Sequence, residues 1–302
     1  MGLIRKEDLH DSLLNSLSNP NLLINGDFQV WQRGEVFTTE ITQDTGLKLY
    51  SADRWHFWNY NPSYPRRSKV EKYNGHLKFT SIGNDWLRQY IEADLSGVPL
   101  TLSISVKGSD ESTIMLQMED SQSPNDESNT LVANKTYSCT GGYDTFVLNI
   151  PKFNYSKFPT VLIRSESIDV FEIEWVKLEL GSVATPFVPR PYGEELALCK
   201  RYYEVSNNDC YISGTKTHTS YKVEYKYDVE KRVSPTIECG NGDTKGQMYL
   251  FVPNNLKLVT PNSISPDTKK VGIEFPLQDN DQLNNGNACG VTGWIKADAE
   301  IY

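Results

Sequence analysis

The side chains best suited to ligand chemistry in this sequence are aromatic. They gather in the segment WHFWNYNPSY, residues 55–64, and two more rings follow at positions 86 and 90. Indole and phenol rings stack on the flat C–H faces of sugars, while polar neighbours hydrogen-bond the hydroxyl groups. Because Trp55 and Phe57 alternate with His56 and Trp58, one of these two sets must face a core. The candidates for binding a saccharide are Trp58, Tyr60, Tyr64, Trp86 and Tyr90.

Catalytic chemistry has little support in the sequence. The four histidines are scattered, at positions 10, 56, 76 and 218, and no nucleophile elbow, zinc-protease helix, phosphate loop or dinucleotide fingerprint is present. A glycosidase needs two converging carboxylates, but among 39 acidic residues a chance pair proves nothing. We expect no enzyme, no catalytic residues, and solvated or turn positions for Asp85, Glu92, Asp94, Glu119 and Asp120.

The charge balance argues against a nucleic-acid partner. The 302 residues carry a formal net charge of -9, whereas phosphate binding needs a basic face. The dense basic cluster of Arg66, Arg67 and Lys69 is explained more simply as a solvated loop.

The five cysteines are an odd number without a CxxC pair, so we expect buried thiols rather than a zinc cage or a disulfide framework. The beginning of the chain lacks the apolar stretch of a signal peptide, and no segment is long and apolar enough to span a membrane. We therefore expect a soluble protein made in a cytoplasm, without membrane insertion.

Residues 5–18, RKEDLHDSLLNSLS, predict an amphipathic helix that Asn19 and Pro20 end. So short a helix is marginal alone in water, so its apolar stripe needs a partner. That partner is the following domain, copies of the same helix in a bundle, or another protein of a larger assembly. The stripe consists of Leu9, Leu13, Leu14 and Leu17.

Short alternating segments separated by turn residues predict β-structure from position 21 onward. The clearest is LTLSISV, residues 100–106, and similar runs occur at 113–118, 145–150 and 160–164. Repeated strands without intervening helices indicate a sandwich or jelly roll. We therefore expect an all-β chain apart from its short helices.

The segment 171–203 marks a domain border. Large apolar residues occupy odd positions from 171 to 175 and even positions from 176 to 180, which predicts one strand with a one-residue bulge. Prolines at 186, 189 and 191 keep the next residues extended, and acidic residues at 194 and 195 suit the start of a short linker helix. A smaller β-domain follows, in which apolar residues at 221, 223, 225 and 227 alternate with charged ones.

Two segments carry a family resemblance: NLLINGDFQVWQRG, residues 21–34, and the strand and linker after residue 171. They resemble bacteriophage tail-fibre and receptor-binding structural proteins with a jelly-roll domain similar to family 4/9-type carbohydrate-binding modules. The resemblance implies a docking or oligomerisation segment at 1–20, a jelly roll at 21–190, and a linker helix with a distal β-domain at 191–302.

The same resemblance implies a structural calcium, with Asp27 and Glu174 as candidate ligands. Gln29 stands where the family commonly has an acidic residue, and Glu174 replaces an aspartate. The residues themselves allow another reading, in which Asn25 and Asp27 form Asx-turn hydrogen bonds with their own backbone.

The function that the resemblance implies is non-enzymatic: a tailed-phage virion protein, as a tail fibre or receptor-binding component that recognises host cell-surface polysaccharide. It implies a homotrimer, an exterior location on the virion, and contacts with other virion proteins through residues 1–20. The alternative is a head, collar or baseplate decoration protein that makes only protein contacts. Release of reducing ends from host polysaccharide would indicate a glycan hydrolase instead.

Overall fold

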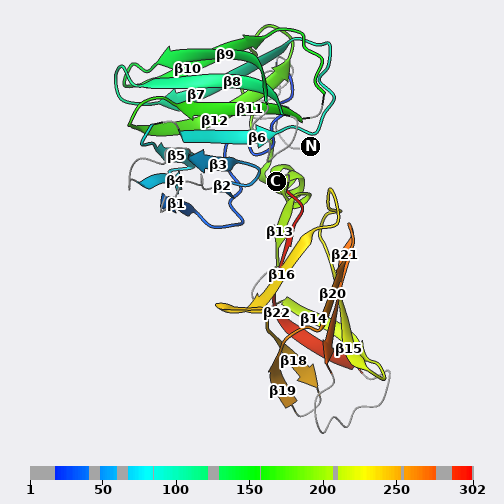
Figure 1. The fold of residues 1–302 in the computed structure, drawn as a ribbon. Helices are drawn as coiled ribbons and strands as arrows, with labels where there is room; N and C mark the ends of the chain where they lie inside the picture. The colour runs from blue at the N-terminus through cyan, green and yellow to red at the C-terminus, as the bar shows by residue number, and fades with distance from the viewer. Residues whose placement is uncertain are drawn as a thin grey trace, which may run out of the picture. The chain divides into compact units, whose positions relative to one another are not determined.

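In the computed structural model, the described residues are 18–40, 48–59, 67–83, 85–121, 129–156, 158–206, 210–252, 255–276 and 288–300. These residues are almost entirely β-structure, and their one helix is α2 (Tyr192–Lys200). The predicted all-β class is therefore confirmed (Figure 1). The predicted N-terminal helix with its leucine stripe lies outside the described residues. The chain divides into two compact units, residues 1–195 with 301–302, and residues 196–300.

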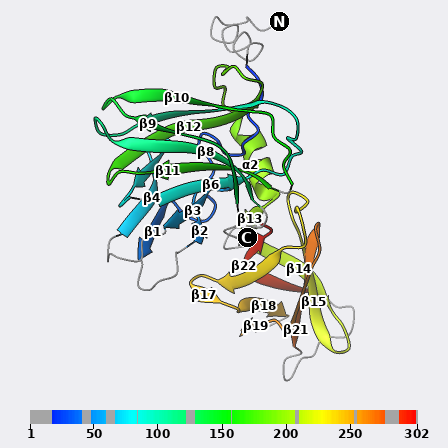
Figure 2. The same cartoon turned by 45° about the horizontal axis from the view of Figure 1, so that its top comes forward.

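The first unit is a sandwich of two six-stranded antiparallel sheets. Sheet A has the order β1 (Val36–Glu40), β4 (Arg67–Tyr73), β5 (His76–Thr80), β12 (Val170–Leu180), β7 (Leu100–Lys107), β10 (Tyr143–Ile150). Sheet B has the order β2 (Lys48–Tyr50), β3 (His56–Asn59), β6 (Asp85–Tyr90), β11 (Phe158–Ser165), β8 (Thr113–Ser121), β9 (Thr130–Ser138). Figure 2 shows β6, β11, β8 and β9 side by side in sheet B. The non-sequential neighbours in both sheets give the predicted jelly-roll sandwich.

The core between the sheets follows the period-two pattern of the strands. Leu102, Ile104 and Val106 of β7 are fully buried, as the alternation of this segment predicts. Trp55 and Phe57 are fully buried in the same core. Of the two alternating sets in this segment, this one is therefore internal, and the set with His56 and Trp58 lies on the other side of sheet B.

The predicted bulge in β12 is present, but its extra residue is Glu174, before Trp175, whereas the apolar pattern placed it after Trp175. Ile173 pairs with Val106 and Trp175 pairs with the next residue of β7, Ser105, so nothing on β7 opposes Glu174. Because one residue is inserted, the buried set changes from Phe171 and Ile173 to Val176 and Leu178.

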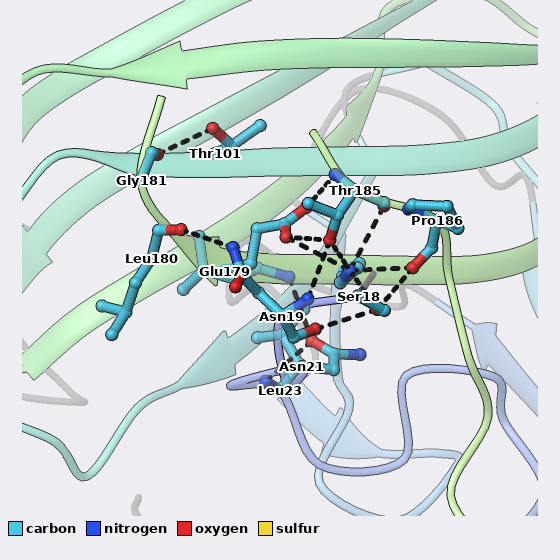
Figure 3. A network of polar contacts seen from close by, with 12 residues as sticks. Ser18, Asn19, Asn21, Leu23, Thr101, Glu179, Leu180, Gly181, Thr185 and Pro186 are labelled. Atoms are coloured by element: carbon cyan, nitrogen blue, oxygen red, sulfur yellow. Dashed lines mark hydrogen bonds and ion pairs between the residues drawn. The ribbon is translucent and has the colours of Figure 1, made fainter. Parts of the chain in front are cut away.

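A buried ion pair stabilises the end of β12. Lys177 Nζ lies 3.2 Å from Glu179 Oε2, and the two side chains are 1% and 0% exposed. The ammonium also donates to Ser18 Oγ at 3.0 Å and to Pro186 O at 2.9 Å, and Thr185 N donates to Glu179 Oε1 at 2.8 Å. Figure 3 shows Thr185 bonded to the Glu179 carboxylate, and Ser18 bonded to the carbonyl of Pro186. The pair thus fixes both the first described residue and the linker to the sandwich.

The second unit contains one ten-stranded antiparallel sheet. Its main path is β17 (Thr244–Lys245), β16 (Thr236–Asn241), β22 (Ala288–Asp298), β14 (Cys210–Lys216), β15 (Ser220–Lys226), β21 (Lys270–Pro276), β20 (Ser263–Pro266). Beside β22 lie β13 (Tyr203–Val205) and β18 (Met248–Val252), and β18 also pairs with β19 (Asn255–Val259). Tyr221, Val223 and Tyr227 of the predicted alternating segment are buried, which confirms the apolar face.

The described cysteine side chains are buried thiols, as predicted: Cys139, Cys199, Cys239 and Cys289. Within the part of the chain that the structure describes, no helix is long and apolar enough to cross a membrane.

Replacing Glu179 by glutamine tests the buried ion pair. Burial lowers the pKa of Lys177, while the pairing with Glu179 opposes that effect, so the ammonium depends on its partner. We expect Glu179→Gln to lower the free energy of unfolding by about 3–5 kcal/mol in urea titrations. The control is Glu166→Gln, at an exposed carboxylate 3.9 Å from Arg164, which should change it by less than about 0.5 kcal/mol. Equal stability of both variants would contradict this role.

Candidate functional site

The outer face of sheet B, on the side away from the core, holds a group of aromatic and arginine side chains. Because Phe57 and Leu87 are fully buried in the core, the residues next to them along β3 and β6 point outward. Register places Trp58 of β3 directly opposite Trp86 of β6, and Arg164 of β11 opposite Trp86 on the other side. We call this group the aromatic face: Trp58, Trp86, Arg88, Tyr90 and Arg164.

Two guanidinium groups lie against the rings of the aromatic face. The ring centroids of Trp58 and Trp86 are 5.9 Å apart with the planes inclined by 40°. Arg88 Cζ lies 5.0 Å from the centroid of Trp58, and Arg164 Cζ lies 5.0 Å from that of Trp86. Contacts of this kind contribute about 0.5–2 kcal/mol each, so they hold the indoles in fixed orientations. Both indoles remain partly exposed.

Tyr90 has a different role from the two tryptophans. Its side chain is only 2% exposed, so its ring offers no platform to a ligand. Its hydroxyl accepts a hydrogen bond from Arg88 Nη1 at 3.0 Å, and Arg88 Cζ lies 5.8 Å from its ring centroid. Tyr90 therefore positions Arg88.

Hydrogen-bonding groups surround the rings. Arg88 Nε and Trp86 Nε1 are buried and have no hydrogen-bond partner among the residues that the structure describes. On β8, which pairs with β11, Gln117 Nε2 donates to Glu119 Oε1, and Asn129 Nδ2 donates to Glu119 Oε2 at 2.9 Å. Burial raises the pKa of Glu119, and the charge of Arg88 partly offsets that shift. The face thus combines two partly exposed indoles with polar groups that are themselves buried.

The sequence located part of this site. It named Trp58, Trp86 and Tyr90, which the fold brings onto one face, whereas Tyr60 and Tyr64 lie outside the described residues. It missed Arg88, although that residue alternates with Trp86 and Tyr90 along β6. It could not find Arg164, because only the pairing of β11 with β6 places it there.

The sequence predicted solvated or turn positions for five acidic residues: Asp85, Glu92, Asp94, Glu119 and Asp120. This prediction is wrong for three of them. Asp85, Glu119 and Asp120 are buried. Asp85 accepts from Ser68 Oγ and Ser81 Oγ at 2.7 Å each, so it stabilises the start of β6. Asp94 does occupy a turn and accepts from Ser96 N at 3.0 Å.

The two candidate calcium ligands have protein partners of their own. Gln29 Nε2 donates to Asp27 Oδ2, and Ser105 Oγ donates to the Glu174 carboxylate. In the part of the chain that the structure describes, Asp27 Oδ1 is buried and has no hydrogen-bond partner, and burial raises the pKa of Asp27. An oxygen of this kind would suit one bond to a cation. Among the described residues, however, no three His, Cys, Asp or Glu side chains are grouped to hold a metal. Calcium takes six to eight oxygens, backbone carbonyls included, so a structural calcium held by Asp27 and Glu174 with nearby carbonyls stays a prediction.

Arg190, in the linker before α2, binds the backbone of the segment 21–34, which we call the N-terminal motif. Arg190 Nη1 donates to Leu23 O at 2.9 Å and lies 3.0 Å from Glu195 Oε2, while Nη2 donates to Asn21 O. Glu195 is buried and accepts from Asn25 N. The guanidinium thus joins the backbone of the motif to the first turn of α2.

Asn25 binds backbone distant from its own turn. Its amide donates to Val30 O at 2.9 Å and to Asp53 O at 3.0 Å, and its Oδ1 accepts from Val30 N. The expected Asx turn at Asn25 is therefore replaced by a bridge between two loops.

No protein-family model matches the chain, and no curated protein matches it. Among solved structures, a CBM4 structure is 15% identical over 52% of this chain and 98% of its own, with a TM-score of 0.40. A putative sugar binding protein from Bacteroides thetaiotaomicron is 13% identical over 54% and 100%, with a TM-score of 0.34. The enzymatically active domain of bacteriophage CBA120 tailspike protein 4 is 14% identical over 53% and 21%, with a TM-score of 0.31. At this identity the likeness concerns the strand arrangement alone.

Either a calcium ion or the Arg190 guanidinium could stabilise the N-terminal motif, and removing divalent ions distinguishes the two. We expect dialysis against EDTA to leave the melting temperature unchanged. Arg190→Gln should lower stability by about 3 kcal/mol, because the buried Glu195 loses its charged partner. Differential scanning calorimetry measures both, with Lys152→Gln, an exposed site, as the control. A melting temperature that falls in EDTA and recovers with calcium would support the metal instead.

Proposed function

We propose that the chain is a non-enzymatic carbohydrate-binding protein and that the aromatic face of sheet B is its binding site. The observation that supports this most is the pair of partly exposed indoles, Trp58 and Trp86, with ring centroids 5.9 Å apart on adjacent strands. Two inclined rings at this spacing can contact the C–H faces of a polysaccharide.

The polar groups of the aromatic face would select among sugars. Arg164, whose side chain is 27% exposed, is the accessible polar group of the aromatic face and can donate to sugar hydroxyls. Because Arg88 and Arg164 already contact the rings, little side-chain entropy remains to be lost on binding.

We further propose that the protein is a tail-fibre or receptor-binding component of a tailed-phage virion. The support is the sequence resemblance of residues 21–34 and of the segment after 171. In this proposal residues 1–20 dock onto other virion proteins or form the axis of a homotrimer, and the β-domains face outward. Three copies of a weak site would bind a repetitive cell surface far more tightly than one.

Alanine variants of the two indoles test the binding site. We expect Trp58→Ala and Trp86→Ala each to weaken adhesion to host cell-wall polysaccharide by about 1–3 kcal/mol, five- to 150-fold. Pull-down with insoluble polysaccharide and affinity electrophoresis measure this. Tyr143→Ala is the matched control, because Tyr143 is an exposed aromatic residue on sheet A. Undiminished adhesion of both tryptophan variants would exclude the aromatic face as the site.

Removing residues 1–17 separates adhesion from assembly. The shortened chain should still adhere to host polysaccharide, because the aromatic face is outside the deleted segment, but it should no longer enter virions. Adhesion assays and immunoblots of purified particles provide the two readouts. A full-length protein that enters virions but never adheres would favour the head, collar or baseplate decoration role.

A further inference from the structure

The outer face of the sheet in the second unit carries an exposed aromatic ring beside a polar hollow. Tyr211 and Ser213 lie two positions apart on β14, so their side chains point to the same side. Ser213 pairs with Gly290 of β22, which pairs in turn with Phe251 of β18. Farther along the same sheet, Gly272 of β21 pairs with Glu224 of β15 on one side and with Ser265 of β20 on the other.

Gly290 supports the ring of Tyr211. A Cβ atom added at this glycine would lie 2.1 Å from Tyr211 Oη and 2.3 Å from its Cζ. The absence of a side chain therefore lets the phenol ring lie flat across β22. The ring is 60% exposed, and the centroid of Phe251 lies 5.7 Å away at 56°. The fold thus presents a large flat ring to solvent with a fixed orientation.

The hollow beside this ring exists because a second glycine leaves space above the sheet. A Cβ atom at Gly272 would meet only Ser265 O, at 3.9 Å. The cavity has a volume of about 350 Å³, and its polar lining comprises Ser213, Thr215, Lys222, Glu224, Ser265 and Glu274.

The charges around the hollow are balanced. Lys222 Nζ lies 2.5 Å from Glu274 Oε1, and Lys270 Nζ lies 2.7 Å from Glu224 Oε2. All these side chains are partly or well exposed, so their remaining donor and acceptor positions are accessible. The hollow therefore offers hydrogen bonds without net charge, which suits neither a polyanion nor a cation.

We propose that this face is a second carbohydrate site, which binds a neutral saccharide. One sugar ring stacks on Tyr211, and the hydroxyls of the adjoining residue enter the hollow and bond to Lys222, Glu224 and Glu274. A flat exposed ring next to balanced hydrogen-bonding groups is the combination that sugar recognition requires. The site is independent of the aromatic face of the first unit.

The test uses the full-length chain and immobilised neutral polysaccharides: β-glucan, xylan, mannan and galactan. In a Trp58→Ala/Trp86→Ala background, we expect residual binding to at least one of them. Tyr211→Ala should weaken that residual binding at least about tenfold, near 1.4 kcal/mol. Gly290→Ala should do the same, because the new methyl group displaces the ring. Tyr211→Phe keeps the ring and should retain the binding, as should the control Val233→Ala at an exposed site of the same unit.

Each outcome decides between the two sites. If the unaltered chain binds a polysaccharide and the double tryptophan variant binds none, the second site is refuted and the aromatic face stands. If Tyr211→Ala and Gly290→Ala leave residual binding unchanged while their thermal melts match the parent, the second site is also refuted. If Tyr211→Ala alone removes all binding of the otherwise unaltered chain, the second site stands and the aromatic face fails. A full-length chain that binds none of the probes refutes the second site.

Discussion

In the first unit, the burial of one face of each sheet determines which side chains lie on the outer faces of the sandwich. Phe57 and Leu87 enter the core, and because side chains alternate along a strand, Trp58 and Trp86 must lie outside. A shift of register by one residue would bury the indoles and expose the core. The orientation of the proposed binding rings therefore depends on the hydrophobic effect acting on their neighbours, and it requires no interaction with ligand.

Two ion pairs lie where the described chain enters the sandwich and where it leaves it. Lys177 with Glu179, and Arg190 with Glu195, join β12 and the linker to the first described residues. A buried pair of this kind adds little net stability over a well-packed apolar pair, but the loss of one partner is costly. Such pairs therefore favour one particular arrangement of the chain ends. That arrangement fixes Ser18 beside Lys177 and the linker.

The sequence predicted the features that depend only on residues close together along one strand. The presence of a bulge in β12 and the core strand 100–106 both follow from alternation within one segment. Alternation also separates Trp55 and Phe57 from His56 and Trp58, but it does not say which set faces the core. Features that depend on pairing between distant segments could not be predicted. Arg164 reaches Trp86 only through the register of β11 with β6, and the burial of Tyr90 and Asp85 depends on residues elsewhere in the chain. The role of Gly290 likewise requires knowledge of which ring lies above it.

The two proposed sites hold their rings by different physical means, and this difference has consequences for affinity. On the aromatic face, guanidinium groups contact the indoles, so the donors that bond to a ligand are also the groups that orient the rings. In the second unit, backbone at Gly290 supports Tyr211, and the ion-paired residues of the hollow are separate from that support. Changes of the polar residues should therefore alter selectivity in the second unit without moving its ring. On the aromatic face the same kind of change alters ring orientation and hydrogen bonding together, so selectivity and affinity are coupled there.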